Sequence, residues 1–146
     1  VQTSPRIPGP VAAAPAGGAD RPIILVVDDE ASIRIFLTRA LRSLGYESVA
    51  TEHGGEAVAA AMDQPIAAVL CDHQMAGMSG IQVYDAVIAV RPDLRPTFVM
   101  MSGDVQNPEL EAFTTDRHVA VLAKPFALDA LARVVADAVA AGQARG

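Results

Sequence analysis

Polar side chains that can do chemistry follow four separate apolar runs of this sequence. Asp28 and Asp29 end the first run, Asp72 ends the second, Ser102 the third and Lys124 the fourth. Taken singly, each has an ordinary interpretation, because Asp and Ser favour caps and turns and a lone Lys is usually a solvated charge. Those interpretations do not explain why carboxylates, a hydroxyl and an ammonium recur at the ends of successive apolar runs.

These residue types suit phosphoryl transfer assisted by a metal ion. Two carboxylates about 4 Å apart repel each other by about 4 kcal/mol at an effective dielectric of about 20, so a cluster of them favours a divalent cation. Mg²⁺ takes oxygen ligands and often shares its shell with a phosphate. A carboxylate can also act as a nucleophile and form an aspartyl-phosphate. An ammonium and a hydroxyl would then stabilise the phosphoryl oxygens.

The order of apolar runs and helical patterns predicts the sheet that positions these groups. We expect strands at 23–27, 47–51, 66–71, 97–101 and 119–123, and helices at 31–44, 55–63, 80–91, 107–115 and 127–141. Four strands are almost continuously apolar, as in a parallel sheet covered on both faces, and the half-polar second strand belongs at an edge. Five such units predict a doubly wound α/β domain, in which ligands lie beyond the carboxyl ends of the strands.

Composition excludes several classes of protein. The net charge of -6 and the lack of a basic cluster argue against a nucleic-acid surface. Cys71 is the only cysteine, so no internal disulfide is possible and a cytoplasmic location fits. No apolar run reaches the roughly 18 residues of a membrane helix, and the start does not read as a signal peptide. We therefore expect a cytoplasmic domain without nucleic-acid or membrane contacts.

The chain is expected to divide into a linker, a domain and a short tail. Residues 1–21 are rich in Pro, Ala and Gly and show no periodicity, which favours a flexible linker. The domain is expected at 22–142 and the tail at 143–146. Because the sequence begins with Val1 rather than Met, we expect a fragment of a longer protein.

From about Pro22 to Ala141 the sequence resembles the receiver domains of two-component response regulators. The motifs "VVDDE", "CDHQMAGMSG", "MMSGD" and "AKPF" carry the resemblance, in this order and spacing. The resemblance implies a flavodoxin-like sheet of order 2-1-3-4-5. It also implies that Asp72 accepts a phosphoryl group from a phosphohistidine. The implied Mg²⁺ ligands are Asp28, Asp29, Asp72 and the backbone carbonyl of Gln74, with Ser102 and Lys124 as catalytic residues.

Three positions depart from the family pattern. Ala76 stands where the family usually has proline, and we expect it to loosen the loop after Asp72. Val121 stands at the switch position, where a Tyr or Phe usually turns inward on phosphorylation, so we expect a weak response there. His73 follows the phosphoacceptor where an apolar residue is more common, and we expect it to be a loop or surface residue.

The resemblance leaves the biological context open. A Pro/Ala-rich linker before the domain and little chain after it favour the receiver of a hybrid histidine kinase. The alternatives are a stand-alone response regulator and a phosphorylation-independent interaction module, which Val121 favours. A phosphatase with an Asp nucleophile would need a second acid two residues later, where Gln74 stands. The domain itself is thus expected to be a phosphoacceptor rather than a turnover enzyme.

The first helix offers a docking surface for the phosphodonor. Its apolar stripe faces the sheet and consists of Ile33, Leu37, Ala40, Leu41 and Leu44, with Gly45 placed to end the helix. Ile35 lies nearly opposite that stripe, among Arg34 and Arg39. We expect Ile35 to anchor the phosphotransfer helices of a histidine kinase or a histidine phosphotransfer protein, with the arginines steering the approach.

Overall fold

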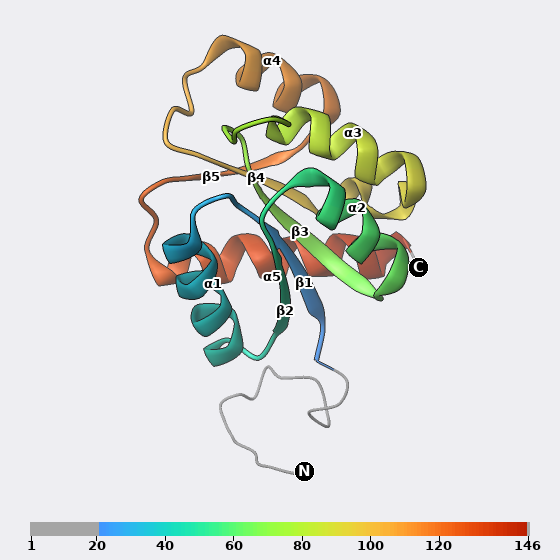
Figure 1. Ribbon diagram of the computed structural model, residues 1–146. Coiled ribbons are helices and arrows are strands. Elements are labelled where there is room, and N and C mark those ends of the chain that lie inside the picture. Colours follow the sequence, from blue (N-terminus) through green and yellow to red (C-terminus); the bar gives the residue numbers. More distant parts are fainter. Residues whose placement is uncertain (1–20, 146) are drawn as a thin grey trace.

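The five strands lie in the order that the resemblance implied. The structure, a computed structural model (Figure 1), describes residues 21–145, so nearly all of the expected linker lies outside the described residues. The strands are β1 (Ile23–Val27), β2 (Glu47–Thr51), β3 (Ile66–Asp72), β4 (Phe98–Ser102) and β5 (Ala120–Ala123). They pair in the order β2-β1-β3-β4-β5, and every neighbouring pair is parallel. The predicted α/β sheet is confirmed.

All five predicted α-helices are present, and a short 3-10 helix adds to them. The α-helices are α1 (Ala31–Ser43), α2 (Gly54–Asp63), α3 (Gly80–Val90), α4 (Pro108–Arg117) and α5 (Leu128–Arg145). The 3-10 helix η3 (Pro92–Thr97) takes Thr97 out of the strand expected there, because two prolines in this segment favour a tight, short turn. Residues 143–145, expected as a tail, continue α5.

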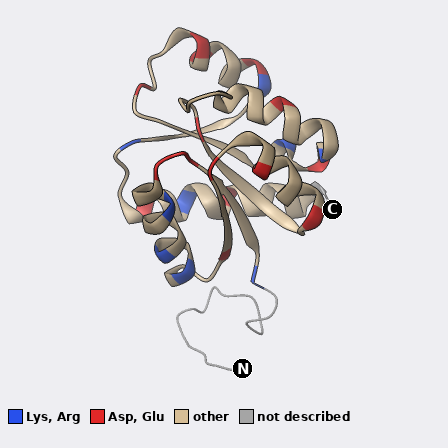
Figure 2. Cartoon of the chain, in the orientation of Figure 1, with Lys and Arg blue, Asp and Glu red and all other residues tan. Residues whose placement is uncertain are grey.

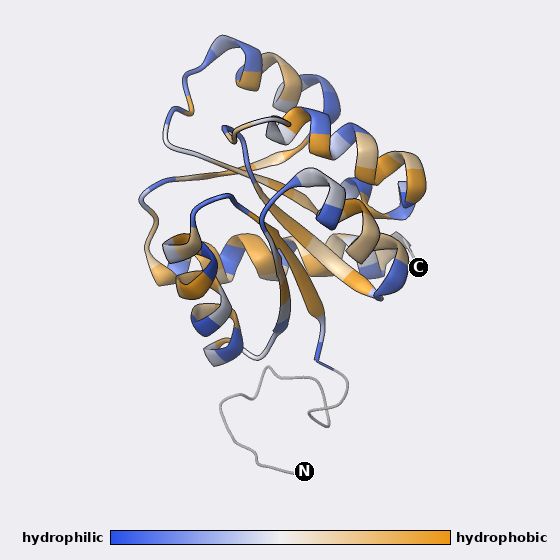
Figure 3. Cartoon of the chain, viewed as in Figure 1, coloured by the Kyte–Doolittle hydropathy of each residue, from blue (hydrophilic) through white to orange (hydrophobic). Residues whose placement is uncertain are grey.

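The sheet separates two apolar layers, as alternation along each strand requires. On β1, Leu25 and Val27 join the layer under α2, α3 and α4, whereas Ile24 and Val26 join the layer under α1 and α5. Figure 3 shows the apolar colour concentrated on the central strands and on one side of the helices. The stripe predicted on α1 is buried in the second layer, at Leu37, Ala40 and Leu41. No helix among the described residues is long and apolar enough to cross a membrane.

The two edge strands of the sheet, β2 and β5, differ in composition. The half-polar β2 is an edge strand, as predicted. The apolar β5 was expected to be covered on both faces, and this prediction was wrong: three of its four residues are exposed. Its apolar sequence reads like a central strand, yet β5 is the other edge and only Leu122 faces the core.

Two local features fix where α3 begins, close to the end of β3. Ser79 and Gln82 form a capping box, in which each side chain accepts a hydrogen bond from the backbone N–H of the other residue. Gly80 lies so close to the end of β3 that a Cβ atom there would come within 2.5 Å of the Asp72 carbonyl oxygen. The loop between β3 and α3 is therefore short and held at both ends.

Candidate functional site

The chemically capable residues predicted from the sequence gather at the carboxyl ends of the strands. Asp28 follows β1, Asp72 is the last residue of β3, Ser102 is the last residue of β4, and Lys124 follows β5. In Figure 2, acidic colour marks the loop after β1 and the end of β3, and basic colour marks the segment after β5. At the carboxyl ends of its strands, the parallel sheet brings together residues that lie up to 96 positions apart in sequence.

Three carboxylates form the centre of this site. Asp28, Asp29 and Asp72 each place an oxygen within 4.8 Å of the others. Asp28 is fully buried and Asp72 nearly so, whereas Asp29 is exposed. One oxygen of Asp28 accepts a hydrogen bond from the backbone N–H of Glu30 at 2.9 Å. The cluster thus has two carboxylates fixed inside the fold and one at its mouth.

Lys124 joins the two buried carboxylates. Its Nζ atom lies 3.1 Å from Oδ2 of Asp28 and 3.2 Å from Oδ1 of Asp72. Burial alone would lower the pKa of Lys124, but the hydrogen bond to Asp28 and the charge of Asp72 outweigh it, so the pKa lies above its usual value. The side chain is therefore an ammonium at neutral pH, directed at the Asp72 carboxylate.

The environment of Asp72 disfavours its charge. Burial raises the pKa of its carboxyl, and the charge of Asp28 raises it further, whereas Lys124 and the backbone N–H of Gln74 pull it down. The same field acts on its neighbour: burial and the two aspartates raise the pKa of the Cys71 thiol well above its ordinary value. Cys71 is therefore a protonated, buried thiol and not a second nucleophile.

The residues of the cluster fit a divalent cation. Three carboxylates against one ammonium leave two formal negative charges in a largely buried place. The donor atoms are all carboxylate oxygens, the type that Mg²⁺ prefers. Burial and, second to it, the negative charge of Asp28 raise the pKa of Asp72, so a cation placed here would favour its ionised form. Gln74, whose carbonyl was implied as a further ligand, lies two residues after Asp72 in the loop.

Ser102 lies on the same edge, one strand away from Asp72. It is buried, and its Oγ atom accepts a hydrogen bond from the backbone N–H of Asp104 at 2.9 Å. Its carbonyl accepts a bond from the backbone N–H of Lys124 at 2.7 Å, which ties the ends of β4 and β5 together. The hydroxyl hydrogen is free of this bond and can be donated to a ligand oxygen.

The loop after β3 differs from the loose loop that we expected. The backbone N–H of Ala76 donates a hydrogen bond to Oδ2 of Asp29 at 3.1 Å. Met75 and Met78 pack on either side of this bond against the layer under α2 and α3. The residue that replaces the family's proline therefore supplies a donor that a proline lacks. No pattern in the sequence pointed to this pairing.

His73 follows the last residue of β3 and is therefore a loop residue, as one part of the prediction had it, but it does not lie on the surface. His73 is 2% exposed, and its backbone pairs with Met101 and Gly80 at the end of the sheet. Its Nε2 atom lies 3.9 Å from Oε1 of Glu109, in the first turn of α4. Its Nδ1 atom is buried without a hydrogen-bond partner. The backbone N–H of His73 thus continues the pairing of β3 with β4, and its imidazole lies against the start of α4.

The proposed docking residues lie on the outer face of α1. Ile35 is 54% exposed, and Arg39 is exposed as well. Arg34 is half-buried because its guanidinium donates a 2.8 Å hydrogen bond to the carbonyl of Asp28. Phe36, which the sequence reasoning did not single out, is 45% exposed and contacts the ring of Phe126 in the loop after β5. Exposed apolar side chains thus lie on the helix that begins directly after Asp28, Asp29 and Glu30.

The switch position is open to solvent. Val121 is 37% exposed on the edge strand β5. The aliphatic side chain has no ring that could move between an outer and an inner position. The departure seen in the sequence therefore concerns an exposed position on the edge strand against which α5 packs.

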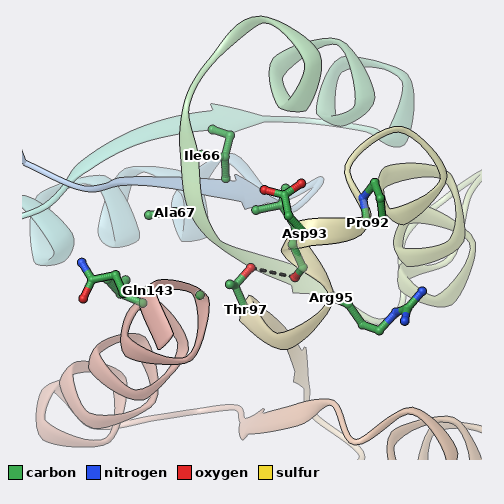
Figure 4. Close-up of a pocket in the computed structure, with 10 residues that line it drawn as sticks. Ile66, Ala67, Pro92, Asp93, Arg95, Thr97 and Gln143 are labelled. Carbon is green, nitrogen blue, oxygen red and sulfur yellow. Dashed lines mark hydrogen bonds between the residues drawn. The ribbon is translucent and has the colours of Figure 1, made fainter. Parts of the chain in front are cut away.

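One cavity among the described residues lies away from the acidic cluster. It has a volume of about 540 Å³ and lies between η3 and α5, near the beginning of β3 (Figure 4). Its lining includes Ile66, Asp93, Arg95 and Gln143, and the hydroxyl of Thr97 inside it is bonded to the Leu94 carbonyl at 2.8 Å. Because it opens at the amino ends of the strands, it is separate from the acidic cluster.

Comparisons with known proteins agree with this geometry. The family described as "Response regulator receiver domain" matches residues 24–136. The response regulator receiver protein CpdR of Brucella abortus is 32% identical over 106 residues, which cover 72% of this chain and 86% of that protein. Transcriptional regulatory protein PrrA of Mycobacterium tuberculosis is 34% identical over 82% of this chain and 51% of its own length. The chain spans only 26% of the regulator ZraR of Escherichia coli.

A solved structure shows the same architecture. The chemotaxis protein CheY4 of Vibrio cholerae superposes with a TM-score of 0.72 at 26% identity, over 80% of this chain and 97% of that one. Residues 24–136, which match the family, contain the acidic cluster, Ser102, Lys124 and nearly all of the five-stranded sheet. The chain belongs to the family of response regulator receiver domains.

Proposed function

We propose that this domain accepts a phosphoryl group from a phosphohistidine onto Asp72, in a Mg²⁺-dependent phosphorelay. The observation that carries the proposal is the contact of Lys124 with both buried carboxylates, beside a third carboxylate at the mouth of the site. This arrangement combines a nucleophile, a set of metal ligands and a cation for the phosphoryl oxygens. Family membership supports the same assignment.

The residues divide the chemistry between them. A carboxylate oxygen of Asp72 attacks phosphorus, the new O–P bond forms, and the N–P bond to the donor imidazole breaks. Lys124 and the hydroxyl of Ser102 stabilise the charge on the phosphoryl oxygens. Asp28, Asp29, Asp72 and the carbonyl of Gln74 would hold Mg²⁺, which would supply positive charge for the phosphoryl oxygens. Burial and the charge of Asp28 raise the pKa of Asp72 and thus disfavour its carboxylate form. A bound cation would favour that form, which is the nucleophile.

The donor is proposed to dock on α1. A phosphohistidine must approach Asp72 from the carboxyl ends of the strands, and α1, which carries the exposed side chains of Ile35 and Phe36, begins directly after the loop with Asp28 and Asp29. Arg39 adds positive charge on the same helix, which steers an acidic partner. The guanidinium of Arg34 donates a hydrogen bond to the Asp28 carbonyl, so we assign Arg34 the role of holding the loop beside the site. The partner is a histidine kinase helix pair or a histidine phosphotransfer protein.

Within this function we propose the context of a cytoplasmic hybrid histidine kinase, with residues 1–21 as the linker to a preceding domain and 22–142 as the receiver. The Pro-, Ala- and Gly-rich composition of that first segment supports a linker. A stand-alone regulator is the alternative. The coding sequence upstream of Val1 decides between them, because a hybrid kinase requires a phosphotransfer and ATP-binding region there.

The test is incubation with acetyl phosphate and Mg²⁺, followed by intact mass measurement. We expect the addition of one phosphoryl group to the wild-type chain. Asp72→Asn and removal of the metal with a chelator should each abolish it. Asp85→Asn, at a carboxylate on α3 outside the cluster, is the matched control and should label normally.

One outcome favours a different function. If the wild-type chain stays unmodified under conditions that label another receiver domain, the phosphoacceptor proposal fails. The exposed aliphatic Val121 would then favour a phosphorylation-independent interaction module.

A further inference from the structure

A single hydrogen bond connects the mouth of the acidic cluster to the loop after β3. The backbone N–H of Ala76 donates to Oδ2 of Asp29 across 47 residues of sequence. Within residues 21–145, no other hydrogen bond or ion pair holds the Asp29 side chain. Asp29 is also the exposed member of the cluster, whereas Asp28 and Asp72 are held by burial and by Lys124.

An exposed carboxylate binds a cation at lower entropic cost when its side chain is already restrained. A free Asp side chain samples several rotamers, and ordering it on binding costs conformational entropy. A bond that already selects one rotamer reduces this cost, as preorganisation does for other binding sites. A carboxylate has about four acceptor positions, so it can accept an N–H and ligate a cation at the same time.

The donor side of the bond is also fixed. Met75 and Met78 pack against the core on both sides of Ala76, and Gly80 brings the start of α3 against the end of β3. Gly77, with φ of 86°, lets the chain turn directly after Ala76. The N–H of Ala76 is thus presented by an anchored loop, which also carries Gln74.

We propose that the backbone N–H of Ala76 is a positioning group for the metal site: it holds Asp29 in the orientation in which its carboxylate joins Asp28 and Asp72. This inference rests on the proposed function, because the cation is the one that phosphoryl transfer requires. A side chain at position 76 does not provide the bond, so any residue except proline supplies it. The chain therefore depends on an amide where the sequence reasoning expected only a loosened loop.

Three substitutions of Ala76 separate the amide from the stiffness of the loop. Mg²⁺ binding is measured by calorimetric titration of the wild-type chain, Ala76→Ser, Ala76→Gly and Ala76→Pro. Serine and glycine keep the N–H, so we expect dissociation constants within about twofold of wild type. Proline removes the donor, and we expect binding about three- to tenfold weaker.

Loop stiffness alone predicts the opposite order. Proline restricts the backbone and glycine loosens it, so a stiffness effect would leave Ala76→Pro at or above wild-type affinity and weaken Ala76→Gly. That order would overturn the proposal. Circular dichroism checks that each variant is folded.

A second measurement needs no metal. We expect amide hydrogen exchange of Ala76 to be slow in the metal-free wild-type chain and faster by tenfold or more in Asp29→Ala. Equal exchange rates would overturn the proposal even if Ala76→Pro does not fold. Wild-type protein that binds no Mg²⁺ at millimolar concentration, yet shows a protected Ala76 amide, would instead contradict the proposed function and leave the Asp29–Ala76 restraint established.

Discussion

The Nζ atom of Lys124 lies 3.2 Å from Oδ1 of Asp72, the proposed nucleophile. The ammonium reaches this carboxylate from the end of the edge strand β5, across β4. It therefore lies within reach of any group that becomes bonded to Asp72. Lys124 also offsets the burial of Asp28, so one side chain serves both the stability and the chemistry of the site.

The first prediction concerns the rate of phosphorylation in Lys124→Ala. We expect labelling by acetyl phosphate to continue but to be about 10- to 100-fold slower, because the variant loses stabilisation of the transferring charge and keeps the nucleophile. The rate of the mass increase at fixed Mg²⁺ measures this. Arg133→Ala, which removes an exposed positive charge on α5, is the control and should label at the wild-type rate. A wild-type rate in Lys124→Ala would contradict the assigned role.

A second prediction follows from the raised pKa of Asp72, which reflects burial first and the charge of Asp28 second. A group with a raised pKa in the folded state stabilises the fold below its unfolded pKa of 3.8, and this contribution is lost as pH rises through the folded pKa. Asp72→Asn should therefore gain stability over the wild-type chain as pH increases above about 4.

Urea unfolding with a chelator present, at a series of pH values, measures this difference. Adding Mg²⁺ should reduce the gap, because the cation binds only the wild-type carboxylate cluster well. Asp93, whose pKa is lowered by its hydrogen bonds to Arg91, contributes equally to both proteins and cancels. A difference between the two proteins that does not change with pH would contradict the prediction.

The sequence sufficed to predict the sheet, its helices and the residues at its carboxyl edge. Runs such as residues 23–27 are apolar at every position, which reports burial on both faces. The same reasoning failed for β5, because an apolar run does not reveal whether a helix covers it. Position in the sheet, and not composition, decides the exposure of Val121.

Contacts between loops could not be predicted from patterns in the sequence. The bond from Ala76 to Asp29 uses a backbone N–H, which every residue but proline carries, so no residue type marks it. The burial of His73 likewise depends on where α4 begins after the preceding loop. Three-dimensional placement of the loops was needed for both.

The third prediction tests docking on α1. Ile35→Asp should slow phosphoryl transfer from the cognate phosphohistidine protein severalfold or more, because it places a charge where the partner's apolar surface must pack. Labelling by acetyl phosphate should be unchanged, since Ile35 does not touch the acidic cluster. Met62→Asp, on the exposed face of α2, is the matched control. Equal protein-to-protein rates for Ile35→Asp and wild type would exclude this anchor.

The fourth prediction concerns Val121. Without a ring at this position, binding of the phosphate mimic beryllofluoride should shift amide resonances of α4 and β5 less than those around Asp72. Heteronuclear NMR spectra with and without the mimic measure the shifts. Val121→Tyr introduces a ring and should enlarge the response at α4 and β5. Large shifts there in the wild-type chain would show that another group carries the signal.

The fifth prediction uses the unpaired nitrogen of His73. His73→Leu removes a buried polar atom without a partner, and Glu109 remains solvated, so we expect the free energy of unfolding to rise by about 1 kcal/mol. Urea denaturation measures the change. His53→Leu, at an exposed histidine, should change stability by less than about 0.5 kcal/mol. A clear loss of stability in His73→Leu would mean that the imidazole makes a stabilising interaction.

The short edge strand β5 has a consequence for self-association. Exposed strand edges are templates on which a second chain can add a strand, and proteins protect them by shortness and by proline. β5 has four residues, and Pro125 follows it within two positions. An added strand would find few backbone groups to pair with before the proline interrupts the ladder. Sheet extension at the β5 edge is thereby disfavoured.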